Sequence, residues 1–122
     1  MLTNLDIMIA GAGLGGLAAA CSLIKAGFSV RIFERAAKLG EVGAGIQLSA
    51  NAMHVLDYFG LGEQVNELSV QPQAYVFRLY NTGEELQRFA LAETHFKMHR
   101  APYNQIHRAD LHKILAKRVT EL

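Results

Sequence analysis

The chain has 122 residues, of which 12 are basic and 11 acidic, and its formal net charge of +1 excludes an electrostatic case for binding nucleic acid or an anionic membrane. Hydrophobic residues make up 51% and charged residues 19% of the sequence, a composition that predicts one soluble folded domain. Because Cys21 is the only cysteine, the chain excludes an internal disulfide and a CxxC pair, and we expect a cytoplasmic protein.

The chain begins with the pattern of a strand, a glycine turn, a helix and a second strand. Asp6–Ala10 is a short apolar run that ends at glycine, which is typical of a parallel strand buried on both faces. Leu14–Ala26 has the period of a helix that Gly27 ends. The apolar face of this helix comprises Leu17, Ala20, Cys21 and Ile24. Since Ser29–Glu34 reads as a second strand, the segment predicts a right-handed βαβ unit.

The same region contains an uncharged run, Ile7–Ile24, that approaches the length of a membrane span. Four glycines interrupt its centre, and no basic residue precedes it as in a signal peptide. We therefore expect no integral membrane segment here.

The middle and end of the chain predict a loop and two helices. Residues 35–45 are polar and rich in glycine, so they predict a surface loop. Asn51 is the expected N-cap of a helix that runs through Phe59 and ends at Gly60. Helical spacing returns in Arg108–Thr120.

Between these helices the sequence predicts a β-hairpin. Two alternating segments, Gln73–Tyr80 and Glu85–Phe89, flank the turn sequence Asn-Thr-Gly-Glu at 81–84. We expect Tyr75 and Phe77 to line the core of this hairpin.

The fold class that follows is α/β, with a parallel sheet that is incomplete in this chain. A doubly wound sheet needs more than two parallel strands, and only two are visible. Because the sequence stops after a helix, where another crossover strand would normally follow, we expect a fragment of a longer protein.

One motif carries chemistry. Gly11-Ala12-Gly13-Leu14-Gly15-Gly16 places glycine at the three positions of GxGxxG, after a strand and at the start of a helix. Gly11 allows the tight turn, Gly13 lets the backbone approach a pyrophosphate, and Gly16 lets helix and strand pack closely. The unpaired amides of the first helical turn, Leu14 and Gly15 among them, then face the phosphates.

The end of the second strand supplies the matching acid. Glu34 stands about 20 residues after the motif, where the ribose-binding carboxylate belongs. A carboxylate accepts hydrogen bonds from ribose hydroxyls and repels a 2′-phosphate, so we expect FAD or NAD at this site rather than NADP.

Four segments together resemble the FAD-dependent aromatic-ring monooxygenases, the single-component flavoprotein hydroxylases that act on salicylate, 3-hydroxybenzoate or 6-hydroxynicotinate. The segments, in order, are Gly11–Gly16, Phe33-Glu34-Arg35, Glu41–Ala52 and His107-Arg108-Ala109-Asp110-Leu111. The resemblance covers essentially the whole chain. It implies that residues 1–122 are the N-terminal part of a Rossmann-like FAD-binding domain, without its later strands and without the substrate domain.

The resemblance also implies roles for individual residues. The glycine motif would bind the FAD diphosphate, Glu34 the adenosine ribose, and Arg35 would lie against the adenine end. Arg108 would contact the ribityl-phosphate region, where a guanidinium offers forked donors. Gln47 would lie beside the flavin and the substrate. It would position them rather than act as a base, because an amide does not titrate. Ala50 departs from the family, where proline is usual, which should loosen the turn before the next helix.

The activity implied is hydroxylation of an aromatic or heteroaromatic acid with NADH or NADPH and O2, through a flavin C4a-hydroperoxide. The partners would be the small aromatic substrate and either a second copy of the chain or the remainder of the same polypeptide. No residue stands out as catalytic acid or base. Two alternatives stay open: a non-catalytic dinucleotide-binding remnant or partner-completed subunit, and an NAD-linked dehydrogenase that shares the strand, turn and acid.

The five histidines predict no metal site. His95 and His99 are four residues apart, and His107 and His112 are five apart. No acidic or cysteine cluster joins either pair in a ligand pattern.

Overall fold

The computed structural model describes residues 5–40 and 43–122. These residues form two compact units. The first contains the described residues up to Ala44 together with His107–Leu122, and the second is Gly45–Ile106. Glu41 and Val42, which belong to the family-like stretch, lie outside the described residues.

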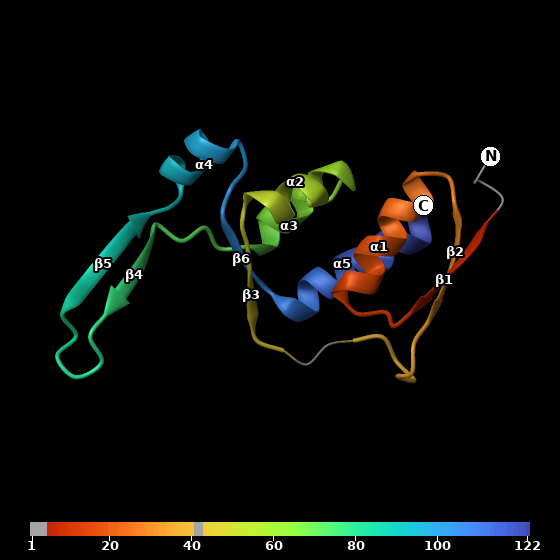
Figure 1. Cartoon of the computed structure of the whole chain (residues 1–122), viewed down its shortest axis with the longest axis horizontal. Coiled ribbons are helices and arrows are strands. Elements are labelled where there is room, and N and C mark those ends of the chain that lie inside the picture. Colours follow the sequence, from red (N-terminus) through yellow and green to blue (C-terminus); the bar gives the residue numbers. More distant parts are fainter. Residues whose placement is uncertain (1–4, 41–42) are drawn as a thin grey trace. The chain divides into compact units, whose positions relative to one another are not determined.

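The first unit is built on the predicted βαβ arrangement. Strand β1 (Asp6–Ala10) leads into helix α1 (Leu14–Lys25), and strand β2 (Ser29–Phe33) returns parallel to β1. Helix α5 (Arg108–Glu121) packs against α1, as Figure 1 shows. The order and type of these elements confirm the prediction, with α1 and β2 each one residue shorter than expected.

The core of the first unit lies between α1 and α5. Its buried side chains are Leu17, Ala20 and Cys21 from α1 and Leu111, Ile114 and Leu115 from α5. Burial raises the pKa of the Cys21 thiol, which keeps it in the unreactive protonated form. The predicted place of Cys21 on the apolar, core-facing side of α1 is therefore confirmed.

The two faces of the β1–β2 sheet differ in how well they are covered. Residues paired across the strands point to the same side, and Ala10 pairs with Phe33. Met8 and Phe33 lie on one face and are 68% and 57% exposed. The other face carries Ile7 and Ile9, which are partly buried toward α1.

The second unit combines short helices and two two-stranded sheets. In chain order it contains β3 (Gly45–Leu48), α2 (Ala50–Tyr58), α3 (Gly62–Leu68), β4 (Ala74–Arg78), β5 (Glu85–Ala90), α4 (Glu93–His99) and β6 (Asn104–His107), whose last residue belongs to the first unit. Strand β3 pairs with β6, and β4 with β5. Four of these elements, β3, α3, α4 and β6, have four to seven residues and were not predicted.

The start of α2 corrects one prediction. Ser49, not Asn51, occupies the N-cap position, and its hydroxyl makes no capping hydrogen bond. Instead Ser49 Oγ donates to Asn51 Oδ1 at 2.6 Å. The Asn51 side chain therefore accepts a hydrogen bond within the first turn of the helix and does not cap it. The predicted end is confirmed within one residue: the helix ends at Tyr58, Phe59 is its C-cap residue, and Gly60 follows with a φ of +76°.

The hairpin of β4 and β5 is confirmed as antiparallel, with an irregularity between Phe77 and Arg78 (Figure 1). The rings of Tyr75 and Phe77 lie 5.3 Å apart, and the Phe89 ring meets Phe77 edge to face at 6.2 Å. Tyr75 and Phe77 are nevertheless 38% and 48% exposed. The prediction that they line a buried hairpin core is wrong, because two strands alone supply no second layer over this face.

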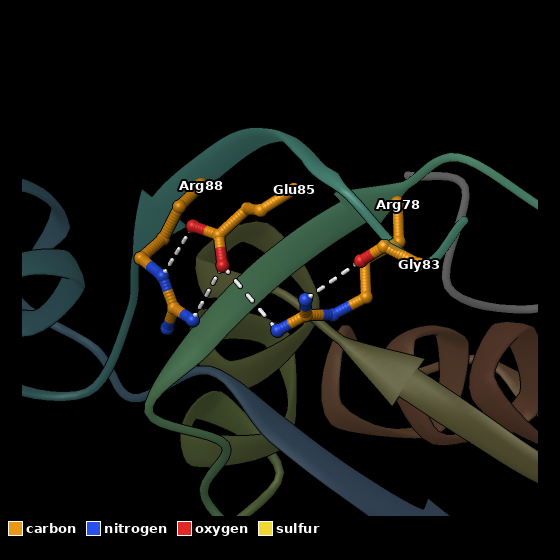
Figure 2. Close-up of polar contacts among 4 residues, drawn as sticks. All are labelled: Arg78, Gly83, Glu85 and Arg88. Atoms are coloured by element: carbon orange, nitrogen blue, oxygen red, sulfur yellow. Dashed lines mark hydrogen bonds and ion pairs between the residues drawn. The ribbon is translucent and has the colours of Figure 1, made fainter.

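An exposed ion-pair network lies beside the turn of this hairpin (Figure 2). Arg88 donates to both carboxylate oxygens of Glu85, at 2.8 and 3.0 Å, and Arg78 reaches the same carboxylate at 3.3 Å. Arg78 also donates to the carbonyl of Gly83 in the turn, at 3.1 Å. The Arg88 hydrogen bonds hold the pKa of Glu85 below its ordinary value. Because these groups are exposed, the network fixes the turn geometry more than it stabilises the fold.

No helix in the described part of the chain is long and apolar enough to cross a membrane. The uncharged run that approached this length is divided among β1, the glycine turn and α1.

Candidate functional site

The glycine turn between β1 and α1 has the geometry of an exposed helix start. Gly11 follows β1 with a φ of +103°, a conformation that suits glycine, and its amide donates to Phe33 O at 2.7 Å. Gly13 is the N-cap residue of α1, and its carbonyl accepts the first helical hydrogen bond, from Leu17 N at 2.9 Å. The amides of the first turn therefore have no acceptor within the helix.

Three glycines of the turn differ in the space around them. A Cβ added at Gly16 would lie 2.1 Å from the carbonyl oxygen of Gly11, so α1 can approach β1 this closely only with glycine there. A Cβ added at Gly13 or at Gly15 would meet no atom within 4 Å. The space above these two residues is open, and a ligand that contacts the first-turn amides can enter it.

Glu34 stands directly after β2 and faces this turn. Its Oε2 accepts from Ala12 N at 2.7 Å and its Oε1 accepts from Ala36 N at 2.8 Å. The hydrogen bonds from these two backbone amides hold the pKa of Glu34 below its ordinary value of 4.5, and the bond from Ala36 has the larger effect. The group is therefore ionised at neutral pH, and each oxygen keeps a further lone pair for a ligand hydroxyl.

A buried histidine that the sequence analysis did not select completes this part of the site. His112, on α5, is 3% exposed, and its Nε2 lies 2.7 Å from the carbonyl oxygen of Ala12. The helical spacing could have indicated its burial, because His112 shares the buried face of α5 with Leu111 and Leu115.

A cavity of about 190 Å³ opens at this place. It is lined by Ala12, Gly13, Glu34, Ala36, Lys38, Leu39, Gly40 and His112. Main-chain amides, one carboxylate and one lysine thus border the same small space. Such a set suits an anionic ligand that also carries hydroxyl groups.

The structure places the other predicted site residues as follows. Arg35 is exposed and adjoins Glu34 in the chain. Arg108 begins α5; its amide donates to Ala44 O at 3.1 Å, and its Cβ would lie 3.3 Å from a Cβ added at Gly43. Gln47 is exposed in β3 of the second unit. The first unit therefore brings together the glycine turn and Glu34, and Gln47 belongs to the second unit.

Within the residues that the structure describes, the histidines belong to no metal-ligand group. The His95 and His99 rings lie 4.6 Å apart. Among residues 5–40 and 43–122, no group of three or more histidine, cysteine, aspartate or glutamate side chains could hold a metal ion. Burial, together with the neighbouring His99, lowers the pKa of His95.

Comparison with known proteins identifies the family of this chain. The FAD binding domain family matches residues 4–122. A 3-hydroxybenzoate 6-hydroxylase of Polaromonas naphthalenivorans (strain CJ2) is 39% identical over 118 residues, which cover 97% of this chain and 30% of that protein. A 6-hydroxynicotinate 3-monooxygenase of Pseudomonas fluorescens is 37% identical over 111 residues, covering 91% of this chain and 29% of that protein.

Among solved structures, the tetrameric form of 2-methyl-3-hydroxypyridine-5-carboxylic acid oxygenase superposes with a TM-score of 0.80 at 28% identity. The superposition covers 95% of this chain and 29% of that one. The chain therefore spans about 30% of the length of the curated relative from Polaromonas. From the match over residues 4–122, the chain belongs to the FAD binding domain family.

Proposed function

We propose that this chain is the N-terminal part of the FAD-binding domain of a monooxygenase that hydroxylates an aromatic or heteroaromatic acid. The observation that carries the proposal is the open glycine turn facing the ionised Glu34, in a chain of the FAD binding domain family. The relatives named as hydroxylases and monooxygenases support this function over an NAD-linked dehydrogenase or a non-catalytic remnant.

In this proposal the first turn of α1 binds the diphosphate of FAD. The amides of Leu14, Gly15 and Gly16 donate to phosphate oxygens, and the helix dipole adds partial positive charge. The open space at Gly13 and Gly15 supports this assignment, because a diphosphate needs access to the backbone. Gly11 allows the tight turn after which the N-terminus of α1 faces the ligand.

Glu34 binds the hydroxyls of the adenosine ribose. Its lowered pKa keeps it charged, so it accepts two hydroxyl hydrogens and repels a 2′-phosphate. Next to it, the exposed guanidinium of Arg35 lies against the adenine end of the cofactor.

Arg108 and Gln47 serve the flavin half of the cofactor. Arg108 stays charged at every working pH and offers forked donors to the ribityl and phosphate oxygens. Gln47 positions groups beside the flavin and the substrate by hydrogen bonding and moves no proton.

Bound FAD supplies the oxygen-transfer chemistry, with NADH or NADPH as reductant and O2 as co-substrate. The residues of this chain bind and orient the cofactor, and the rest of the polypeptide supplies the later strands and the substrate domain. Relatives named for 3-hydroxybenzoate and 6-hydroxynicotinate indicate a small aromatic acid as substrate. We place the enzyme in the cytoplasm, in keeping with the single buried thiol of this part of it, and propose a homodimer as its simplest assembly.

The test uses the full protein that contains this sequence. We expect a yellow protein whose flavin is released on denaturation, and NADH or NADPH oxidation stimulated by 3-hydroxybenzoate or 6-hydroxynicotinate. Glu34→Gln should retain less FAD, by roughly tenfold in affinity, because it loses a charged acceptor. A colourless protein that binds NAD instead, with an affinity that depends on Glu34, would refute the proposal in favour of a dehydrogenase.

A further inference from the structure

The second residue of the glycine turn is held by side chains on both sides of its backbone. Ala12 N donates to Glu34 Oε2 at 2.7 Å, and Ala12 O lies 2.7 Å from His112 Nε2. Glu34 and His112 come from positions 22 and 100 residues away in the chain. Ala12 itself is 4% exposed, so neither of its backbone groups is well placed to exchange these partners for water.

The direction of the hydrogen bond to His112 follows from its chemistry. A carbonyl oxygen only accepts, so Nε2 carries the hydrogen and donates it. Because His112 is 3% exposed, its ring is fixed by the packing around α5. The bond is therefore made by a donor that is held in place before any ligand arrives.

Fixing the Ala12 carbonyl also fixes the next amide. The Ala12–Gly13 peptide unit is planar and trans, so its C=O and N–H point in opposite directions. When the oxygen is tied to His112, the Gly13 N–H points away from α5. Gly13 is exposed, and it lines the same cavity of about 190 Å³ as Ala12, Glu34 and His112.

We infer that His112 is a positioning residue for the diphosphate site. It holds the Ala12–Gly13 peptide plane so that the Gly13 amide faces phosphate in a fixed orientation, next to the amides of the first helical turn. This inference rests on the proposed function and adds to it a residue that acts through the backbone of the glycine turn. An apolar side chain could fill the same buried volume, but it could not hold the peptide plane, and this difference is measurable.

The experiment compares two substitutions in the full protein. His112→Leu removes the donor and keeps an apolar side chain, whereas His112→Gln keeps an N–H donor with similar reach. Bound FAD is first removed, and dissociation constants are then measured by calorimetry for ADP, which carries the diphosphate, and for adenosine, which does not. We expect His112→Leu to weaken ADP roughly 5- to 10-fold, as the loss of one hydrogen bond implies, with adenosine unchanged. His112→Gln should restore most of the ADP affinity.

Leu115→Ala is the matched control. Leu115 is 3% exposed one turn further along α5, so its truncation lowers the melting temperature through a cavity. We expect it to leave both dissociation constants unchanged. If Leu115→Ala weakens ADP as much as His112→Leu does, general loosening of α5 explains the result and the inference fails.

The outcomes separate this inference from the proposed function. Wild-type protein that binds neither ADP nor FAD overturns both. Wild-type protein that binds ADP, together with a folded His112→Leu variant of equal affinity, overturns only the role of His112. Should His112→Leu not fold, ¹⁵N NMR of the wild type decides: hydrogen on Nε2 that persists with ADP bound supports the inference, and an unprotonated Nε2 overturns it.

Discussion

Replacing Gly16 by alanine tests how closely α1 must approach β1. The added Cβ would lie 2.1 Å from Gly11 O, 3.1 Å from Gly11 C and 3.4 Å from Ile9 Cγ2. Since real Cβ atoms essentially never come within 3.0 Å of such atoms, the backbone must open by about 0.9 Å, the difference between 3.0 and 2.1 Å. The obstructing atoms belong to the main chain and cannot rotate away as a side chain would.

The expected loss follows from two opposing terms. Forcing extra volume into a packed contact costs about 3 kcal/mol at the upper end of the usual range. Alanine returns about 1 kcal/mol through its better helix propensity. The net loss of about 2 kcal/mol corresponds to a melting temperature about 4 °C lower, or less, in the full protein, because the shift per kcal/mol falls as the folding unit becomes larger. The displaced turn should also bind FAD more weakly.

Thermal and urea unfolding of the full protein measure the effect, and Gly15→Ala is the control in the same helical turn. A Cβ at Gly15 meets nothing within 4 Å, so the free energy of unfolding should stay unchanged or rise by up to about 1 kcal/mol. If Gly16→Ala proves as stable as Gly15→Ala, helix and strand do not need the close contact, and this account of Gly16 is wrong.

Three further predictions concern other positions. Gly13→Val should cost about 1 kcal/mol or less of stability, as a poorer N-cap, but lower FAD affinity at least tenfold by filling the open space, measured by flavin fluorescence; unaltered affinity would contradict the diphosphate contact. Because the folded-state pKa of Glu34 is lowered from 4.5, its stabilising contribution is full above about pH 4.5 and is lost as pH falls through the lowered value. Hydrogen exchange at Ala12 N, corrected for intrinsic rates, should then accelerate in acid. A corrected rate that does not change with pH would argue against the hydrogen bond from Ala12 N to Glu34. Asn104→Asp should lose about 3 kcal/mol at pH 7, because Asn104 is fully buried and donates to Asn66 at 2.6 Å; chemical unfolding at pH 7 and pH 4 measures this loss, which should shrink at the lower pH.

The sequence was sufficient for the first unit because its signals are local and agree with one another. The apolar run of β1, the change of period at Leu14 and the glycine at position 27 each mark one boundary, and the structure places the elements there within one residue. Glu34 was found in the same way, from its fixed spacing after the glycine motif.

The second unit was harder to predict because its elements are short and partly polar. Strand β6 buries Asn104 and Ile106 and exposes Gln105 and His107. Because one of the two buried residues is polar, the alternation of buried and exposed positions does not show as an alternation of apolar and polar residues. Helices α3 and α4 each have seven residues, too few to show a helical period. Ala92, the N-cap residue of α4, has a φ of +49°, which the sequence does not signal because alanine rarely adopts it.

The contribution of His112 could not be predicted for a different reason. Its partner is a backbone carbonyl 100 residues earlier in the chain, and backbone groups leave no mark in a sequence pattern. The resemblance to flavoprotein hydroxylases points to Arg108 at the start of the same helix, and only the packing of α5 on α1 turns His112 toward the glycine turn.

The pairing of β1 and β2 has a practical consequence for handling the protein. In the part of the chain that the structure describes, each of these strands has one hydrogen-bonded neighbour, so one edge of each is open. Open strand edges next to exposed apolar side chains such as Met8 and Phe33 favour aggregation between copies. We expect these 122 residues, produced with nothing covering that face, to precipitate during purification, and the substitution Met8→Lys to keep them in solution.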